Sequence, residues 1–459
     1  MAQFNTGNGH YQTHNKTLFE VNMLAAGNGH IYDSYNRVPI ELTAGASDAF
    51  GRLRVSEAFT LGDYKHLYAL DPNFIDKVSN GGTVTYQPDK ACARLTTTSN
   101  PLSSVIHQTK FYHHYMPGKS QLIKSTFNFY ANTLNVTKRT GYFDDKNGMY
   151  FEQDGNGVLS FCIRTNISGT PSDTRKITQA NWNIDKCNGL GPSSFNLDIT
   201  KTQILFIDFQ WLGVGRVRMG FVHDGNFIVA HEFYNSNNLE TVYISNPNLP
   251  VRCEMFNTGS TSGAFMDQIC STVISEGGYV EAGQDWEAST PVLVNVSPTN
   301  GVVGSANSIP VLSIRLANAF HTYENRMIVR SGNINIFTKD ETIKWQLVKL
   351  PGVANLTGGV WANVHVNSGV QYNANATTYT DGEPIDGGYV SASTTGSQGL
   401  GNLSKSSGSG IPNSPSTAKK NYIVQNFDST DSEIFSVIVS NLGATNTAVG
   451  ISWNWREIY

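Results

Sequence analysis

The sequence predicts an all-β protein of antiparallel, jelly-roll-like β-sandwich domains, with an extended N-terminal arm and very little helix. Charged residues make up only 15% of the 459 residues, against about 25% in an ordinary soluble domain. Gly, Asn, Ser and Thr fill the difference, and they favour turns and strands over helices. Short runs of alternating apolar and polar residues recur between turn clusters, which is typical of antiparallel sandwiches.

Residues 1–60 are expected to form an extended assembly arm. A Gly-Asn-Gly-His motif at 7–10 recurs at 27–30, although two copies are too few for a solenoid. Each Asn-Gly pair is a turn signal, and such a segment has little apolar surface to bury by itself. We therefore expect neighbouring subunits to hold this arm.

The rest of the chain is expected to contain two β-rich regions. A β-sandwich is predicted over 61–290 and a second β-rich region over 291–459, and whether they form one domain or two stays open. The stretch near 391–417 is dominated by Ser, Gly, Thr, Asn and Pro, so it is predicted to be a long exposed loop.

Strand signals are frequent and helix signals are rare. Two hairpins are predicted, pairing 149–153 with 158–163 across the turn 154–157, and 216–222 with 227–231 across 224–226. The best helix signal covers 71–78, where Asp71 can cap and Pro72 suits the first helical position.

A further strand is predicted near the C-terminus. Residues 434–439 precede a turn at 443–446, and the strand that follows alternates apolar and polar residues. Because strand side chains alternate between faces, one face of it is expected to carry Val449, Ile451, Trp453 and Trp455.

No catalytic or metal-binding motif is complete. Gly118-Lys119-Ser120 has the end of a phosphate loop, but His113 stands where the first Gly belongs, so a turn is favoured. His231-Glu232 begins like HExxH, but Asn235 follows at the fifth position. Adjacent histidines on a strand point to opposite faces, so His113 and His114, with His107 nearby, are not expected to bind a metal.

The segment 143–154 fits a calcium loop only in part, and a hairpin turn at 146–148 is favoured. Trp182 and Trp286 are possible platforms for sugars, although core packing is the commoner use of Trp. Paired carboxylates for sugar hydrolysis cannot be recognised from their spacing in the sequence, because the reaction depends on the distance between them in the folded protein. The acidic candidates are Asp144, Asp208, Glu232 and Asp285.

Composition excludes several other classes of protein. The net charge of −4 argues against a strongly basic nucleic-acid binder. No apolar run approaches the roughly 20 residues of a membrane span, and the N-terminus does not resemble a secretion signal. The five cysteines form no CxxC pair and are expected to be reduced, buried small hydrophobes. No cofactor is expected.

Five stretches are distinctive in their wording, namely DAFGRLRVS at 48–56, LGDYK at 61–65, QWLGVGRVRMG at 210–220, ISEGGY at 274–279 and WNWRE at 453–457. These stretches resemble segments of virion structural proteins of tailed bacteriophages, notably marine and cyanobacterial ones. The resemblance implies a β-rich, oligomeric part of a virus particle. It does not fix which part, whether tail, fibre, baseplate or head surface, and it assigns no active site.

The favoured hypothesis is a non-enzymatic structural component of a virion that assembles with itself and with other phage virion proteins. A homo-oligomer is expected, with a trimer as one candidate by analogy with fibrous phage parts. Expected assembly contacts are His10, His30, Phe50, Arg52, Leu53 and Arg54. Phe50 and Leu53 would anchor by burial, while Arg52 and Arg54 either pair with carboxylates of a neighbour or stay solvated.

Three other functions stay open. The first is a capsid-surface decorating or head-fibre protein. The second is a receptor-binding module for a host surface glycan, which requires aromatic and Asn or Asp groups that converge in a groove. The third is a depolymerase, which requires two carboxylates that face each other across a cleft.

Overall fold

The computed structural model describes residues 2–5, 11–14, 48–49, 58–259, 262–280, 282–298, 308–392, 401–406 and 422–459. The chain divides into two compact units, Met1–Ser47 and Asp48–Tyr459. In the first unit, β1 (Ala2–Asn5) pairs with β2 (Tyr11–His14) in antiparallel orientation.

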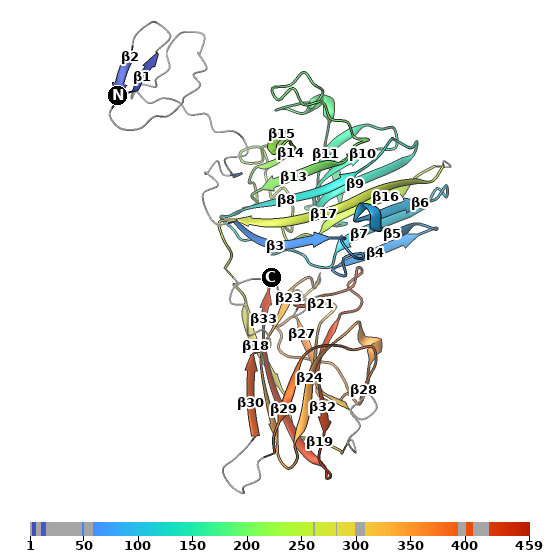
Figure 1. Ribbon diagram of the computed structural model, residues 1–459, viewed down its shortest axis with the longest axis vertical. Coiled ribbons are helices and arrows are strands. Elements are labelled where there is room, and N and C mark those ends of the chain that lie inside the picture. Colours follow the sequence, from blue (N-terminus) through green and yellow to red (C-terminus); the bar gives the residue numbers. More distant parts are fainter. Residues whose placement is uncertain are drawn as a thin grey trace. The chain divides into compact units, whose positions relative to one another are not determined.

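The second unit confirms the predicted all-β fold (Figure 1). Its described residues form antiparallel sheets, interrupted by short 3-10 turns. Those turns are η2 (Pro88–Lys90), η3 (Gln179–Asn181) and η4 (Val353–Asn355).

A seven-stranded and an eight-stranded sheet form the first sandwich. The seven-stranded sheet has the order β12-β11-β10-β9-β16-β7-β4. Its strands are β4 (Phe74–Ser79), β7 (Ser104–Thr109), β9 (Val136–Phe143), β10 (Gly148–Gln153), β11 (Leu159–Thr165), β12 (Ser172–Thr178) and β16 (Val251–Asn257).

The eight-stranded sheet has the order β15-β14-β13-β8-β17-β6-β5, and β3 also pairs with β17. Its strands are β3 (Ala58–Lys65), β5 (Thr83–Gln87), β6 (Cys92–Thr97), β8 (Ser120–Asn128), β13 (Gln203–Phe209), β14 (Val217–His223), β15 (Asn226–Phe233) and β17 (Ala264–Glu276).

An aromatic core joins these two sheets. Phe151 and Phe161 of the seven-stranded sheet and Phe221 of the eight-stranded sheet belong to one buried cluster. Trp182, in the connection between β12 and β13, is only 2% exposed. Its ring stacks on Phe161 with 4.4 Å between centroids. Trp182 is therefore a core residue and not a platform for a sugar.

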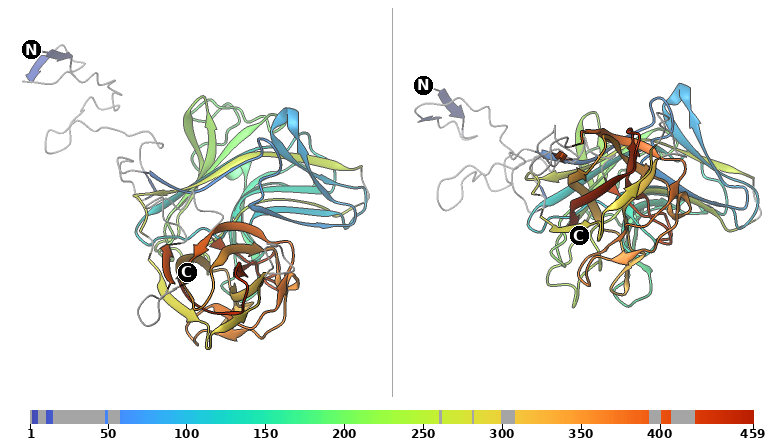
Figure 2. Two further views of the ribbon diagram at one scale, coloured as in Figure 1. Left: turned by 60° about the horizontal axis from the view of Figure 1, so that its bottom comes forward. Right: turned by 90° about the horizontal axis from the view of Figure 1, so that it is seen from below.

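The C-terminal strands form a second pair of sheets, which the left view of Figure 2 shows end-on as a ring. One sheet contains β18 (Gln284–Ser289), β33 (Thr447–Ile458), β23 (Ile328–Thr338) and β30 (Gly401–Ser406), with β19 (Val294–Val296) and β31 (Tyr422–Ile423) at its margins. The other contains β26 (Ala362–Asn363), β27 (Val370–Asn373), β20 (Ile309–Leu316), β32 (Ile434–Asn441), β24 (Ile343–Leu350) and β29 (Glu383–Val390).

Two small two-stranded sheets complete this region. They pair β21 (Ala319–Phe320) with β22 (Tyr323–Glu324), and β25 (Leu356–Thr357) with β28 (Thr378–Tyr379). The stretch near 391–417, predicted to be a loop, lies largely outside the described residues, which include β30.

The predicted hairpins and the C-terminal alternation are confirmed. β10 pairs with β11 and β14 with β15. In β33, Val449, Ile451, Trp453 and Trp455 are all buried. The preceding strand, β32, lies in the opposite sheet, so the turn between them carries the chain from one layer to the other.

The predicted helix over 71–78 is wrong, because its second half is strand β4. Phe74 pairs with Thr109 of β7, and its ring stacks on His107 with 4.2 Å between centroids. Asp71 caps a turn instead, since its carboxylate accepts the Asn73 N–H at 2.9 Å. Pairing with a sheet edge therefore outweighs a weak local helix preference.

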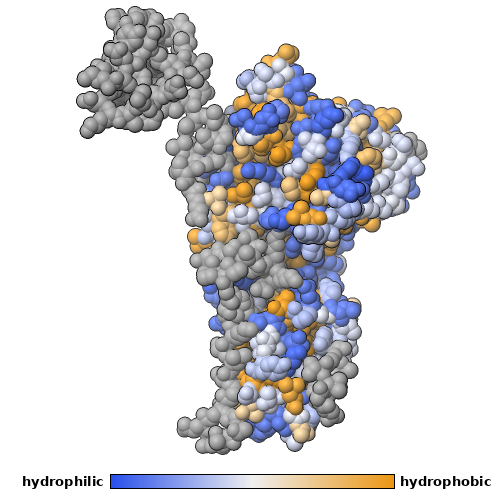
Figure 3. All heavy atoms as spheres, in the orientation of Figure 1, coloured by the Kyte–Doolittle hydropathy of each residue, from blue (hydrophilic) through white to orange (hydrophobic). Residues whose placement is uncertain are grey.

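The exposed apolar residues are dispersed. On the face drawn in Figure 3, hydrophobic residues form separate patches among hydrophilic ones. The most exposed large ones include Tyr68 and Leu190, which lie on different loops. Scattered apolar residues of this kind are normal on a protein surface. No helix in the described part of the chain is long and apolar enough to cross a membrane.

Candidate functional site

Charged side chains occupy the outward face of the seven-stranded sheet. In β10, Met149 and Phe151 point into the core, so the intervening Tyr150 and Glu152 point outward. The register places Arg139 of β9 opposite Glu152 on one side and opposite Glu254 of β16 on the other. Three neighbouring strands therefore bring a cation between two carboxylates.

Arg139 is the centre of this charged layer. Its Nε donates to Glu152 at 2.6 Å, and its Nη1 donates to Glu254 at 2.8 Å. Its guanidinium also lies 4.9 Å from the ring centre of Tyr150 and 4.7 Å from that of Phe256. The Arg139 side chain is 12% exposed and that of Glu152 is 1% exposed, so both charges depend on these partners.

Two further arginines extend the layer. Arg164 forms a bidentate pair with Asp173, with Nε at 2.9 Å and Nη2 at 3.1 Å from the carboxylate oxygens. Arg252 donates to Asp145 at 2.5 Å. Bidentate guanidinium–carboxylate pairs are among the stronger hydrogen-bonded contacts in proteins. They hold the side chains of this face in fixed positions.

Lysine and glutamate complete the balance of charge. Lys176 of β12 donates to Glu152 at 2.7 Å, and Arg252 also reaches Glu254 at 3.3 Å. Four cations therefore face four carboxylates, so this group of eight side chains is neutral. Its members are Arg139, Arg164, Lys176, Arg252, Asp145, Glu152, Asp173 and Glu254.

Arginine contacts also set the ionisation of this layer. Burial acts to raise the pKa of Asp173, but the hydrogen bonds and charge of Arg164 outweigh it and hold that pKa below its usual range. The pKa of Asp145 is lowered in the same way, against the effect of burial, by Arg252. Both carboxylates are therefore ionised at neutral pH.

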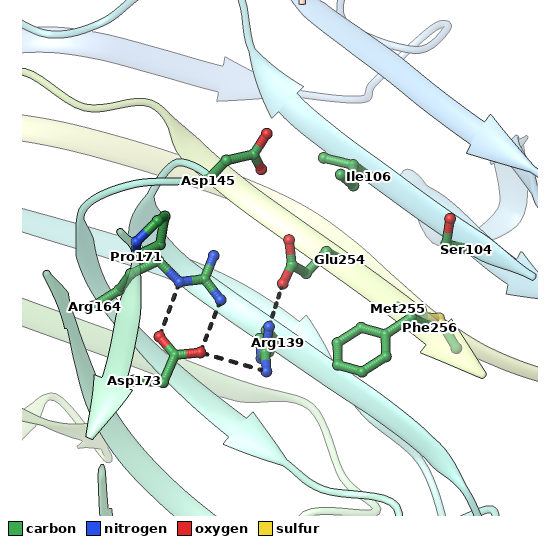
Figure 4. Close-up of a pocket in the computed structure, with 10 residues that line it drawn as sticks. All are labelled: Ser104, Ile106, Arg139, Asp145, Arg164, Pro171, Asp173, Glu254, Met255 and Phe256. Atoms are coloured by element: carbon green, nitrogen blue, oxygen red, sulfur yellow. Dashed lines mark hydrogen bonds and ion pairs between the residues drawn. The ribbon is translucent and has the colours of Figure 1, made fainter. Parts of the chain in front are cut away.

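A cavity of about 290 Å³ opens among these side chains (Figure 4). Its charged wall consists of Arg139, Asp145, Arg164, Asp173 and Glu254, and Ile106, Pro171 and Phe256 contribute apolar surface. Such a cavity offers fixed donors, fixed acceptors and an aromatic ring, which is the usual make-up of a small-molecule binding site.

The same carboxylates are poor candidates for hydrolytic chemistry. A general acid must hold a proton at the working pH, and a neighbouring guanidinium favours the ionised form. Asp173 and Asp145 both line the cavity, and each accepts hydrogen bonds from an arginine, Arg164 and Arg252 respectively, which holds its pKa below its usual range. The geometry of this face therefore suits binding better than acid catalysis.

The expected assembly contacts lie outside the described residues. They are His10, His30, Phe50, Arg52, Leu53 and Arg54, and they remain predictions. The described part of the chain does include the first two residues of the DAFGRLRVS stretch, Asp48 and Ala49, which are 4% and 2% exposed.

Asp48 and Ala49 are held by the QWLGVGRVRMG stretch. Nε of Arg216 donates to the Ala49 carbonyl at 3.0 Å, and Nε2 of Gln210 donates to the same oxygen at 3.4 Å. Nη2 of Arg216 reaches the Asp48 carbonyl at 3.5 Å. Two stretches that are about 160 residues apart in the sequence therefore meet in the structure.

A tight loop between β13 and β14 makes this contact possible. Leu212 and Gly213 both have positive φ, at 36° and 78°, and Gly tolerates that backbone region best. The Trp211 indole donates to the Ile244 carbonyl at 2.9 Å, and the Gly215 N–H donates to the Trp211 carbonyl at 2.7 Å. The loop thereby presents Gln210 and Arg216 side by side.

The structure does not bring all four acidic candidates together, although Asp208 and Glu232 lie opposite Arg218 on its two neighbouring strands. Asp208 is buried and pairs with Arg218 across β13 and β14. Asp144 accepts the N–H groups of Lys146 and Asn147 in the turn after β9, which agrees with the hairpin turn favoured there. Glu232 pairs with Arg216 at 3.5 Å and Asp285 with Arg456 at 2.7 Å.

Two of the three histidines considered above for a metal site, His107 and His113, have structural partners. His107 contacts Asp76 at 2.5 Å, and His113 contacts the Tyr64 hydroxyl at 2.7 Å. Among the described residues, no group of three or more His, Cys, Asp or Glu side chains has a geometry that could hold a metal ion. Trp286 is half-buried and stacks on His365 with 5.4 Å between ring centroids. Lys119 closes the turn that leads into β8, since its N–H donates to the Met116 carbonyl at 3.1 Å.

The expectation that all five cysteines are buried is wrong for Cys270. Cys92, Cys162, Cys187 and Cys253 are buried, whereas Cys270 is exposed. The register of β17 shifts between Gln268 and Cys270, and such a bulge re-aims the side chains that follow it. Burial raises the pKa of the Cys162 thiol to about 11, which makes it a poor nucleophile.

Comparison with known proteins gives only distant likenesses. Neither a protein-family model nor a curated protein sequence matches the chain. A solved Shewanella oneidensis MR-1 protein of unknown function is 7% identical, covers 54% of this chain and 100% of its own length, and has a TM-score of 0.32.

Two other solved structures show a similar likeness. The CBM2 module of the evolved Dit of Lactobacillus casei BL23 phage J-1 is 9% identical, with 49% of this chain and 99% of that chain covered and a TM-score of 0.30. A β-1,3-glucanase from Mycobacterium marinum is 9% identical, with 47% and 97% covered and a TM-score of 0.29. Likenesses this distant do not identify a function.

Proposed function

We propose that the protein is a non-enzymatic structural component of a tailed-phage virion that assembles with itself and with neighbouring virion proteins of the tail, fibre or baseplate. The observation that carries the proposal is the contact of Arg216 and Gln210 with the backbone of Asp48 and Ala49. These residues belong to two of the stretches in which the sequence resembles virion proteins.

The contact gives the N-terminal segment a fixed starting point. A guanidinium that donates to two successive carbonyls restrains the backbone there, and both residues are almost completely buried. An arm that transmits force or specifies a neighbour in a particle needs such an attachment. Without it, the backbone at the base of the arm would lose conformational entropy each time the arm binds a neighbour.

The neutral, ion-paired layer supports the non-enzymatic part of the proposal. Each carboxylate that lines the cavity is bound by an arginine, and none is left as an evident proton donor. A capsid-surface or head-fibre location is compatible with the same arm and differs only in the neighbour. A depolymerase would require turnover of a polysaccharide by the purified full chain, which we expect to be absent.

The test is the mass of the purified protein in solution. We expect the full chain to form a homo-oligomer in size-exclusion chromatography with light scattering. A variant without residues 2–47 should be monomeric and keep its β-rich circular dichroism spectrum. The proposal would be contradicted if the full chain were monomeric, or if the truncated chain still formed the same oligomer as the full chain.

A point variant weakens the attachment. Arg216→Met removes the guanidinium that donates to Asp48 and Ala49, leaves the Gln210 hydrogen bond to Ala49 and also breaks the ion pair with Glu232, so the variant should be under-represented in particles assembled with it. Lys201→Met removes an exposed cation on the β12–β13 connection and serves as the control, with incorporation like that of the unmodified chain. Equal incorporation of both variants would remove the role assigned to Arg216.

A further inference from the structure

The cavity on the outward face of the seven-stranded sheet has a use that assembly does not require. We propose that it is a binding site for a neutral oligosaccharide, with about one or two sugar rings seated in the cavity against the Arg139–Asp173 edge and beside the Phe256 ring, which itself packs on Arg139. This proposal does not depend on the proposed function, since it concerns a different sheet from the one that holds Asp48 and Ala49.

The first argument is a gap between a donor and an acceptor. Nη2 of Arg139 lies 3.9 Å from Oδ2 of Asp173, which is too long for a hydrogen bond. A hydroxyl group beside the line that joins them, at about 2.8 Å from each atom, can accept from the guanidinium and donate to the carboxylate. Figure 4 draws this ion pair as a dashed line between the two side chains, both of which line the cavity. A hydroxyl is both donor and acceptor, as this gap requires.

The second argument is the neutrality of the face. Arg164 already donates through two nitrogens to Asp173, and Asp145 already binds Arg252. A phosphate or uronate would have to compete with these carboxylates for the guanidiniums, and a cation would meet carboxylates that are already neutralised. Charge complementarity therefore favours neither ion. A neutral ligand with many hydroxyl groups uses the remaining lone pairs and N–H groups without breaking an ion pair.

The third argument is the apolar surface beside the charges. Phe256 and Ile106 are half-buried and Pro171 is exposed, and all three line the cavity. Sugars have apolar C–H faces as well as polar edges, so an aromatic ring next to fixed polar groups suits both parts of the ligand. The cavity volume of about 290 Å³ lies just below the usual range for small-molecule sites, about 300–1,000 Å³.

The site is also fixed before any ligand arrives. Arg139 is held by two carboxylates and packed against two rings, and Arg164 is held by Asp173 and by the Asp144 carbonyl at 3.0 Å. A preorganised site loses little side-chain entropy on binding. A weak ligand such as a single oligosaccharide can therefore be retained.

The experiment uses the full chain and an array of neutral and acidic oligosaccharides, followed by calorimetric titration of those that bind. We expect at least one neutral oligosaccharide to bind with a dissociation constant of about 1 mM or lower. Ile106→Trp places an indole in the cavity and should weaken that binding at least tenfold. Leu102→Trp adds the same side chain at a position that is 73% exposed and outside the cavity, so it should bind like the unmodified chain.

A second variant that fills the cavity keeps the test valid if the first one misfolds; we call these two the blocking variants. Pro171→Trp fills the cavity from the exposed β11–β12 loop, so the test remains valid if Ile106→Trp does not fold. The site is supported if both Ile106→Trp and Pro171→Trp weaken binding and the control, Leu102→Trp, does not. The proposal is overturned if the folded chain binds no neutral oligosaccharide, if only acidic sugars bind, or if binding survives in a folded blocking variant. The assembly proposal is unaffected by these outcomes, because all three variants leave Asp48, Ala49 and Arg216 unchanged.

Discussion

Replacing Arg139 by Met tests whether the charged layer holds the seven-stranded sheet together. The change keeps an unbranched side chain on β9 but leaves Glu152 and Glu254 without their shared guanidinium. Removing one partner of a buried ion pair typically costs about 3–5 kcal/mol. Lys176 still binds Glu152 at 2.7 Å and Arg252 still reaches Glu254 at 3.3 Å, so we expect about 3 kcal/mol, at the lower end of that range.

The assay is denaturant and thermal unfolding of the full chain, followed by circular dichroism. A loss of about 3 kcal/mol corresponds to a fall in midpoint temperature of about 6–12 °C for a domain of this size. The double variant Arg139→Met/Glu152→Gln should lose less unfolding free energy than the two single variants added together. We expect a difference of at least about 1 kcal/mol, because the two residues are in direct contact.

The control is Lys65→Met. Lys65 pairs with Asp63 at 3.2 Å, but both side chains are more than half exposed, so the loss should stay below about 1 kcal/mol. If Arg139→Met costs no more than this control, water screens the layer as it does a surface ion pair. The reasoning about a fixed, preorganised face would then be refuted.

Three further expectations follow from buried groups. Burial lowers the pKa of Lys138 from 10.5 to about 8. The unfolded chain therefore binds more protons between these values, and unfolding free energy should rise with pH by about 3 kcal/mol relative to Lys138→Met, as measured by denaturant titrations at pH 7.5 and 10.5. If the unfolding free energies of the two proteins changed equally between these two pH values, the lowered pKa of Lys138 would be excluded. The pKa of Asp173 is lowered, so its contribution to the free energy of unfolding is complete above about pH 4 and is lost as the pH falls through its folded-state pKa. Upon acidification, the urea midpoint of Asp173→Asn should therefore fall less than that of the unmodified chain. An equal fall would contradict the lowered pKa of Asp173. Trp453 is fully buried and donates to Ser331 at 2.9 Å, so Trp453→Ala should lower unfolding free energy by about 3–5 kcal/mol, whereas a loss below about 1 kcal/mol would show that β33 is not part of a packed core.

Local alternation was sufficient to find individual strands. The hairpins β10–β11 and β14–β15 and the buried face of β33 follow from side-chain periodicity and turn residues, which are properties of short segments. The error at β4 has the same origin. Asp71 and Pro72 are genuine local helix signals, but the sheet edge offered by β7 and the ring of His107 are invisible in a short segment.

The charged layer could not be predicted, because it depends on register between distant strands. Arg139 meets Glu152 across 13 residues of sequence and Glu254 across 115. A signal was present in β16, where Arg252 and Glu254 alternate with core residues, although a solvent-facing sheet could equally have carried Thr or Ser at those positions. Alternation alone does not say which charges become neighbours.

The two proposals use opposite layers of one sandwich, and this has a consequence for the assembled particle. The loop that holds Asp48 and Ala49 joins β13 and β14 of the eight-stranded sheet, whereas the cavity lies on the outward face of the seven-stranded sheet. The outward faces of two packed sheets point away from each other, so contacts made near one need not cover the other. If both proposals hold, each subunit of an oligomer presents its own sugar site, and several weak sites on one particle reach through avidity an attachment strength that a single cavity cannot provide.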